Sequence, residues 1–120
     1  MVRTAAQRGG RWAEQRAQRL LLQAGWRPLA LRWGCRWGEL DLLLHKPPDR
    51  LLLVEVKGRR AGLCGAVRLG LDRRKRARLA AALALWQAAH PPYGHCSVEL
   101  VAAVVPLPPA RGPVRWIRWH

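Results

Sequence analysis

The residues best suited to chemistry lie in the segment Gly38–Lys57, GELDLLLHKPPDRLLLVEVK, which holds four of the seven acidic residues of the chain. Asp41 and Glu55 stand among leucines and valines, where a carboxylate is costly to bury, and Lys57 follows Glu55 by two positions. Two neighbouring carboxylates repel each other unless a cation lies between them, and hard oxygen ligands select Mg²⁺ or Mn²⁺. The pattern predicts a divalent metal site held by Asp41 and Glu55. With Lys57 to orient and help deprotonate an attacking water, such a site is suited to phosphodiester hydrolysis.

Strand geometry decides whether these groups can meet. One strand is expected over 37–45 and another over 51–57, and the turn KPPDR between them makes the two an antiparallel pair. Side chains alternate between the faces of a strand. On the first strand this separates two sets, Glu39, Asp41 and Leu43 on one face and Leu40, Leu42 and Leu44 on the other. On the second strand the shared face holds Leu51, Leu53, Glu55 and Lys57. Asp41, Glu55 and Lys57 should therefore meet at one end of a buried sheet.

The simpler alternative is a surface ion pair between Glu55 and Lys57, with Asp41 merely exposed. For an isolated D…ExK match this alternative would be preferred, because the pattern is short and common. The apolar strands around the carboxylates, the scarcity of acids and the flanking helices favour a built site.

The remaining elements are predicted from periodicity and end signals. A helix is expected over 10–24, with Gly25 at its C′ position and Glu14 at the edge of its buried face. Asp72 can cap a second helix that runs to about Ala89. Three more strands are expected, over 29–33, over 98–105 and, at an edge, over 114–119. Residues 51–57 form a nearly continuous apolar run, which predicts a strand covered on both faces. The order is α-β-β-β-α-β with an extra final strand, in a single α/β domain over residues 1–120.

The charge of the chain points to a polyanionic partner. The formal net charge is +15, and it is not a basic tail: residues 1–60 hold 13 basic and 5 acidic side chains, and residues 61–120 hold 9 and 2. Nucleic acid is a commoner partner than a membrane surface for a basic domain of this kind. A protein that is merely basic stays open as an alternative.

Other features of the sequence indicate the cellular compartment. The three cysteines, Cys35, Cys64 and Cys96, are far apart and form no CxxC pair, which favours a reduced, cytoplasmic location. The N-terminus lacks the apolar region of a signal peptide, and no apolar run is long enough to cross a bilayer, so no membrane association is expected.

Several blocks of the sequence together resemble a known family. They are GRWAEQRAQRLLLQAGW, RWGELDLLL, LLLVEVKGRR, GAVRLGLDRRKRARLAAALALW and VELVAAVV followed by VRWI. The chain is similar in these blocks to the bacterial YraN family of uncharacterised proteins and, through its D…ExK pattern, to the PD-(D/E)XK nuclease superfamily. Leucine, not proline, precedes Asp41.

The resemblance implies a restriction-endonuclease-like fold, with a central mixed sheet flanked by helices, related to Holliday-junction resolvases. It implies that Asp41 and Glu55 are metal ligands, that Lys57 is the catalytic lysine and that Glu14 is an additional catalytic acid. Glu39 matches the family's GE-D block, and its role is left open. Resolvase relatives act as dimers, so a homodimer is an open alternative.

Basic residues around the second helix are candidate contacts for nucleic acid. Cations in the first turns of a helix oppose the helix dipole unless an anion binds there, and both helix N-termini and arginine receive phosphate oxygens. The candidates are Arg59, Arg60, Arg73, Arg74, Lys75, Arg76 and Arg78. Lys75 shares a stripe with Leu79, Ala82 and Trp86, so it can point inward. A solvated basic face is the competing interpretation.

The predicted function is that of a Mg²⁺- or Mn²⁺-dependent endonuclease acting on DNA, with branched structures suggested by the resolvase likeness alone. The competing hypothesis is a non-catalytic nucleic-acid-binding domain that retains the fold. The same basic side chains would contact the phosphates of DNA or of RNA.

Overall fold

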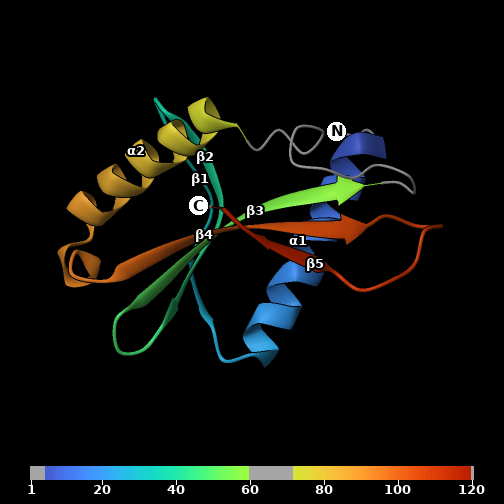
Figure 1. Ribbon diagram of the computed structural model, residues 1–120, viewed down its shortest axis with the longest axis horizontal. Helices are drawn as coiled ribbons and strands as arrows, with labels where there is room; N and C mark the ends of the chain where they lie inside the picture. Colours follow the sequence, from blue (N-terminus) through green and yellow to red (C-terminus); the bar gives the residue numbers. More distant parts are fainter. Residues whose placement is uncertain (1–4, 60–71, 120) are drawn as a thin grey trace.

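Two helices and five strands follow each other in the expected order. The computed structural model describes residues 5–59 and 72–119. Its elements are α1 (Ala5–Gln23), β1 (Arg27–Cys35), β2 (Gly38–Lys46), β3 (Arg50–Arg59), α2 (Arg73–Ala89), the short 3₁₀ helix η1 (Pro91–Tyr93), β4 (Ser97–Pro106) and β5 (Arg115–Arg118). The fold is mixed α/β, with a five-stranded sheet between two helices (Figure 1).

The strands lie side by side in the order β1-β2-β3-β4-β5. Neighbouring strands run antiparallel except β3 and β4, which are parallel and pair along their whole length from Arg50–Ser97 to Arg59–Pro106. A parallel neighbour requires a crossover connection, and α2 lies within this one. The sheet is therefore mixed, and β5 lies at its edge, as the sequence predicted.

The two faces of the sheet bury separate apolar clusters. The cluster under α1 includes Ala13, Ala17, Leu21, Leu42, Leu44, Leu52, Val54 and Val105. The cluster under α2 includes Leu40, Leu43, Leu51, Leu53, Leu79, Ala82, Leu83 and Trp86. Because β3 contributes alternate residues to both clusters, it is covered on both faces, which confirms the prediction from its apolar run.

The alternation predicted for β2 is wrong at one residue. Leu40 was expected on the face of Leu42 and Leu44, but it packs in the α2 cluster while they pack in the α1 cluster. The change of face occurs next to Asp41, where pairing between β2 and β3 ends. On the other side of β2, Arg32 has a left-handed φ of 51° between two regularly paired residues of β1. At Asp41, β2 therefore has the distorted backbone of β1 on one side and has lost its pairing with β3 on the other. This allows β2 to twist, so that Leu40 turns to the α2 face.

Helix α1 begins at Ala5, five residues before the predicted start. Alanine, glutamine and arginine favour helix, and two glycines in the interior cost stability without ending it. Its C-terminus is a Schellman motif: the Trp26 amide donates to the Leu21 carbonyl at 3.0 Å, and the Gly25 amide donates to the Leu22 carbonyl at 3.1 Å. Gly25 has a φ of 95°, so it occupies the C′ position as predicted.

Helix α2 begins where the sequence placed its cap. The Asp72 carboxylate accepts a hydrogen bond from the Lys75 amide at 2.7 Å. This bond fixes the first turn, and the first turn carries the Lys75 side chain. The cap therefore links the stability of the helix to the position of the Lys75 side chain.

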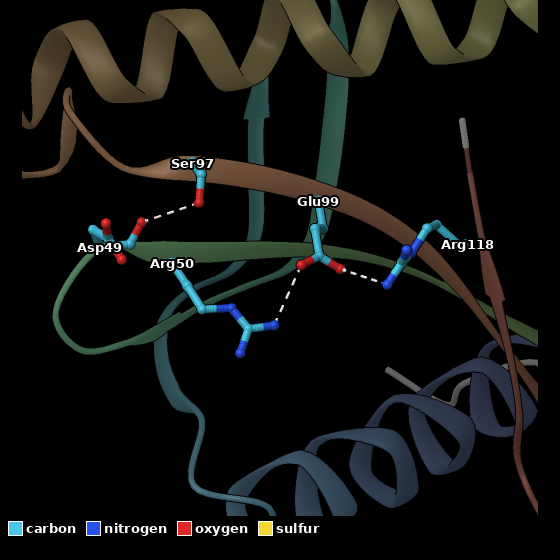
Figure 2. A network of polar contacts seen from close by, with 5 residues as sticks. All are labelled: Asp49, Arg50, Ser97, Glu99 and Arg118. Carbon is cyan, nitrogen blue, oxygen red and sulfur yellow. Dashed lines mark hydrogen bonds and ion pairs between the residues drawn. The ribbon is translucent and has the colours of Figure 1, made fainter.

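Polar contacts tie β3, β4 and β5 together at the end of the sheet where β3 begins (Figure 2). Glu99 lies between Arg50 at 3.3 Å and Arg118 at 3.5 Å, and the Ser97 amide donates to the Asp49 carbonyl at 2.9 Å. The charged side chains are 37–65% exposed, so each ion pair contributes little to stability. Glu99 acts as a tether between strands, at the opposite end of β3 from Lys57.

None of the described helices is long and apolar enough to cross a membrane.

The first prediction concerns the Asp72 cap of α2. Replacing Asp72 by alanine removes the acceptor for the Lys75 amide and should lower the free energy of unfolding by about 1 kcal/mol. Asp72→Ser, which keeps a capping oxygen, should recover most of the loss in chemical denaturation. Equal losses in the two variants would show that the carboxylate acts by charge and not as a cap.

Candidate active site

The site lies where β2 and β3 part. The last paired residues of the two strands are Leu42 and Val54. Beyond them β2 stays paired with β1 to Gly38, while β3 stays paired with β4 to Arg59. The sheet forks at this point, and the next residues on the two arms are Asp41 and Glu55.

Asp41 closes the fork with a side-chain hydrogen bond. Its Oδ2 accepts from the backbone amide of Val56 at 2.9 Å, in place of a backbone acceptor on β2. The carboxyl is mostly buried beside the Glu55 carboxyl. Burial, followed by repulsion from Glu55, raises the pKa of Asp41 to about 7, although the Val56 hydrogen bond works in the opposite direction. Asp41 is thus a carboxyl that can exchange a proton or a cation near neutral pH.

Glu55 is the buried charged residue of the described chain, at 7% exposure. Two ammonium groups share its Oε1 atom: Lys75 Nζ at 2.6 Å and Lys57 Nζ at 3.3 Å. Charge-assisted bonds of this length compensate a desolvated carboxylate. The negative charge of Glu55 is therefore balanced by two lysines in direct contact, whereas Asp41 accepts one backbone hydrogen bond and attracts Lys75 only at longer range.

The two lysines share one carboxylate oxygen but differ in their affinity for a proton. Burial and the neighbouring Lys75 lower the pKa of Lys57, and attraction to Glu55 offsets this only in part. Burial also acts to lower the pKa of Lys75, but its hydrogen bonds with Glu55 and Lys57, together with attraction to Glu55 and Asp41, outweigh burial and leave the pKa raised. Lys75 is the ammonium that holds its proton, and Lys57 is the amine that more readily gives one up.

A cleft of about 260 Å³ opens onto Asp41, Glu55 and Lys75. Trp37, Gly38, Glu39, Asp41, Glu55, Lys75, Arg78 and Leu79 line it. The β1–β2 turn and β2 supply one side, and α2 supplies the other. The cleft is small and cationic on its α2 side, which suits a phosphate group better than a large apolar ligand.

Glu14, the predicted additional acid, lies at the margin of this cluster. Its Oε2 is 3.1 Å from Arg32 Nε, an ion pair without hydrogen-bond alignment. Burial raises the pKa of Glu14 above its usual range, Arg32 opposes that change, and Glu39 and Glu55 are close enough to add repulsion. Glu14 belongs to the electrostatic surroundings of Glu55, with its carboxylate turned to Arg32.

The predicted nucleic-acid contacts separate into several positions. Lys75 points inward to Glu55, while Arg78 lines the cleft. Arg73 and Arg74 are exposed in the first turn of α2.

The other three candidates are placed differently. Arg76 is partly buried, and its Nε has no hydrogen-bond partner among the described residues. Arg59 donates to the carbonyl of its neighbour Gly58 at 3.0 Å. Arg60 lies outside the described residues.

The oxygen donors present fit a divalent ion. Within residues 5–59 and 72–119 no three His, Cys, Asp or Glu side chains gather closely enough to hold a metal by themselves. Asp41 and Glu55 supply two carboxylates, and Mg²⁺ is commonly bound by one or two carboxylates while it keeps several waters. A divalent cation would also relieve the repulsion that raises the pKa of Asp41.

Two features of the site escape sequence reasoning. Arg32 pairs with Glu14 and has a left-handed backbone conformation. No sequence pattern predicts that conformation for a non-glycine residue within a strand. Trp37 lies at the mouth of the cleft, 41% exposed, with the Arg36 guanidinium 5.1 Å from its ring centre. A tryptophan next to a turn has no distinguishing pattern, because most tryptophans fill core volume.

The second prediction follows from the raised pKa of Asp41. In the folded protein Asp41 keeps its proton up to about pH 7, whereas in the unfolded chain it loses the proton near 3.8. As pH rises through this window the folded state therefore loses stability relative to the unfolded state. Asp41→Asn, which keeps an acceptor for Val56, should nearly match wild type near pH 4 and be more stable by up to about 4 kcal/mol near pH 8, without divalent metal.

The measurement is urea unfolding across this pH range, with Asp49→Asn as the control for loss of an exposed acid. A gain for Asp41→Asn that does not depend on pH would contradict the assigned electrostatics.

Comparison with known proteins identifies the family. The model of the uncharacterised protein family UPF0102 matches residues 13–104, which include every group of the site described above. A UPF0102 protein of Prochlorococcus marinus strain MIT 9303 is 48% identical over 112 residues, covering 92% of this chain and 88% of its own. One from Parasynechococcus marenigrum is 47% identical and covers 91% and 79%. One from Frankia alni is 40% identical and covers 88% and 86%. The chain belongs to the UPF0102 family.

Proposed function

We propose that this protein is a metal-dependent nuclease that hydrolyses phosphodiester bonds in DNA. The observation that carries the proposal is the meeting of the Asp41 and Glu55 carboxyls at the β2–β3 fork, with Lys57 beside Glu55. The element order is consistent with a restriction-endonuclease-like fold of the PD-(D/E)XK superfamily, and we assign the chain to it as part of this proposal. Fold alone would not carry the activity; the grouping of these side chains supports it.

Asp41 and Glu55 would hold the metal ion, Mg²⁺ or Mn²⁺. When bound there, the ion supplies Lewis-acid chemistry, neutralising negative charge at the reacting phosphate and making water easier to deprotonate. The protein contributes a partly buried site in which the two carboxyls are already fixed, one by the Val56 amide and one by two lysines. Fixed ligands of this kind reduce the reorganisation needed when the substrate arrives.

The lysines would divide the remaining work. Lys57 has a lowered pKa, so its amine can accept a proton from the attacking water. Lys75 keeps its proton and can contact a phosphate oxygen while it stays near Glu55. Glu14, whose carboxylate is turned to Arg32 and which lies near enough to Glu55 to be repelled by it, need not touch the substrate.

The substrate would approach along α2. Arg73 and Arg74 are exposed on its first turn, and Arg78 lines the cleft one turn later, so a row of cations leads to Glu55. Such a row contacts phosphates and carries no sequence information. Branched DNA is the substrate class that the resolvase likeness suggests, and a homodimer belongs to the same suggestion.

One observation favours a second function. The Lys75 ammonium lies 2.6 Å from Glu55 and compensates this carboxylate without a metal. A site neutralised in this way would suit a non-catalytic nucleic-acid-binding domain. The two functions differ in whether a divalent ion binds the Asp41 and Glu55 carboxyls beside Lys75.

The third prediction concerns cleavage. The purified protein should cut a labelled DNA substrate, from a panel of linear, flapped and four-way-junction forms, when Mg²⁺ or Mn²⁺ is present. Asp41→Asn and Glu55→Gln should each lower the rate at least about 100-fold, because each removes a ligand charge, while DNA binding is kept. Asp49→Asn should cut like wild type.

The contrary result is binding without cleavage of any substrate in either metal. It would leave the non-catalytic function in place of the nuclease.

The fourth prediction concerns the cations of α2. Arg74→Ala and Arg78→Ala should each weaken DNA binding and reduce the slope of log affinity against log salt by roughly 1, because each loses one phosphate contact. Arg27→Ala removes an exposed arginine at the start of β1 and should leave the slope unchanged. Equal slopes in all three variants would remove α2 from the interface.

A further inference from the structure

A second hollow, larger than the cleft at Glu55, lies between α1 and the segment that follows β4. Its volume is about 490 Å³. Trp12, Arg16 and Arg19 line it from α1, and two prolines, Arg111 and Gly112 line it from the other side. We call it the arginine–tryptophan groove. Neither the nuclease function nor the non-catalytic function proposed for the site uses this groove.

The α1 residues of the groove form one stripe. Positions 12, 16 and 19 are four and three residues apart, so their side chains lie on the same side of a helix. Glu14 is two residues from Trp12, which places it about 200° around the helix on the side away from the stripe. Among the described residues that line the groove there are three arginines and no acid. The groove therefore has a positive potential that no lining carboxylate offsets.

The groove is built around a fixed arginine and an exposed aromatic face. Arg16 Nη2 donates to the Gly112 carbonyl at 2.8 Å and joins the two walls, and its guanidinium lies 5.9 Å from the Trp12 ring centre. Trp12 is 39% exposed, although a tryptophan normally gains by burial. Arg19 and Arg111 are exposed on the two sides. An open ring between cations is the combination that binds an unpaired base and its phosphates.

The groove begins beside the strand that carries the candidate active site. The Leu107 amide donates to the Arg59 carbonyl at 3.0 Å, two residues beyond Lys57 on β3. Leu107 also packs against two glycines: a Cβ on Gly58 would lie 2.9 Å from a Leu107 methyl, and one on Gly9 would lie 3.4 Å away. This contact clamps α1 and the end of β3 to the residue from which the groove wall starts. The groove wall thus starts beside the end of β3 that lies two residues beyond Lys57, while α1 lines the groove and α2 lines the cleft.

We propose that the arginine–tryptophan groove binds a single-stranded stretch of nucleic acid. A base stacks on Trp12, and the flanking phosphates contact Arg19 and Arg111. A duplex hides the faces of its bases, so only an unpaired base can use the ring. An acidic peptide would satisfy the arginines but would leave the ring unused. The proposal rests on the proposed function in one respect, that the ligand is nucleic acid, and it assigns the strand beyond the cleft to this groove.

The test is fluorescence anisotropy with a labelled oligothymidylate of about 12 nucleotides, with chelator present so that neither metal nor cleavage is needed. Trp12→Ala should weaken binding about tenfold, because one stacked base is lost, while Trp12→Phe should retain most of the affinity. Arg19→Ala and Arg111→Ala should each weaken binding about three- to tenfold. Arg27→Ala is the control for loss of an exposed arginine outside the groove. A matched duplex should bind Trp12→Ala and wild type alike.

Three results would overturn the proposal. They are binding of Trp12→Ala equal to that of wild type, an equal loss for single strand and duplex, and displacement of the oligonucleotide by oligoglutamate as readily as by unlabelled oligothymidylate. The assay separates this proposal from the nuclease proposal. Loss of binding in Trp12→Ala without any cleavage by wild type would support the groove and reject the nuclease. Cleavage with unchanged binding would do the reverse.

Discussion

The rest of the site depends on repulsion between two carboxyls, Asp41 and Glu55, that the fork of the sheet brings together in a partly buried place. Water cannot screen the pair fully, so other groups must. Glu55 is compensated by Lys57 and Lys75, each on the same oxygen. Asp41 receives one backbone hydrogen bond and keeps a pKa of about 7. Burying two adjacent carboxyls costs free energy of folding, and carboxyls with perturbed pKa values are typical of functional sites.

The fork also separates an apolar part of the sheet from a polar part. Up to Leu42 and Val54 the strands form one continuous sheet with an apolar cluster on each face. Beyond them β2 follows β1, while β3 follows β4, and polar groups replace apolar ones. Helix α2 then covers one side of the fork with Lys75, and α1 approaches with Glu14. At the other end of the sheet the backbone pairing of β2, β3 and β4 is continuous, and the Glu99 ion pairs lie there, at the opposite end from the site.

Much of this arrangement could be predicted from the sequence because it depends on short-range rules. Alternation along β3, the capping oxygen of Asp72 and the glycine at position 25 each fix a local geometry. The face of Leu40 could not be predicted, since it depends on where two strands stop pairing and on a left-handed residue, Arg32, in the strand alongside. The pairing of Glu14 with Arg32 follows from the same distortion. The arginine–tryptophan groove depends on the packing of a loop on α1, which periodicity within one element does not reveal.

The central claim is that Asp41 and Glu55 form one coupled site that a divalent cation can occupy. The most direct measurement is an NMR titration of isotope-labelled side-chain carboxyls, recorded with and without Mg²⁺. We expect the Asp41 carboxyl to titrate near pH 7 without metal, as its burial beside Glu55 requires, and to titrate at markedly lower pH when Mg²⁺ is added. An Asp41 that titrates in the usual range of an exposed aspartate, and that does not respond to Mg²⁺, would contradict the account.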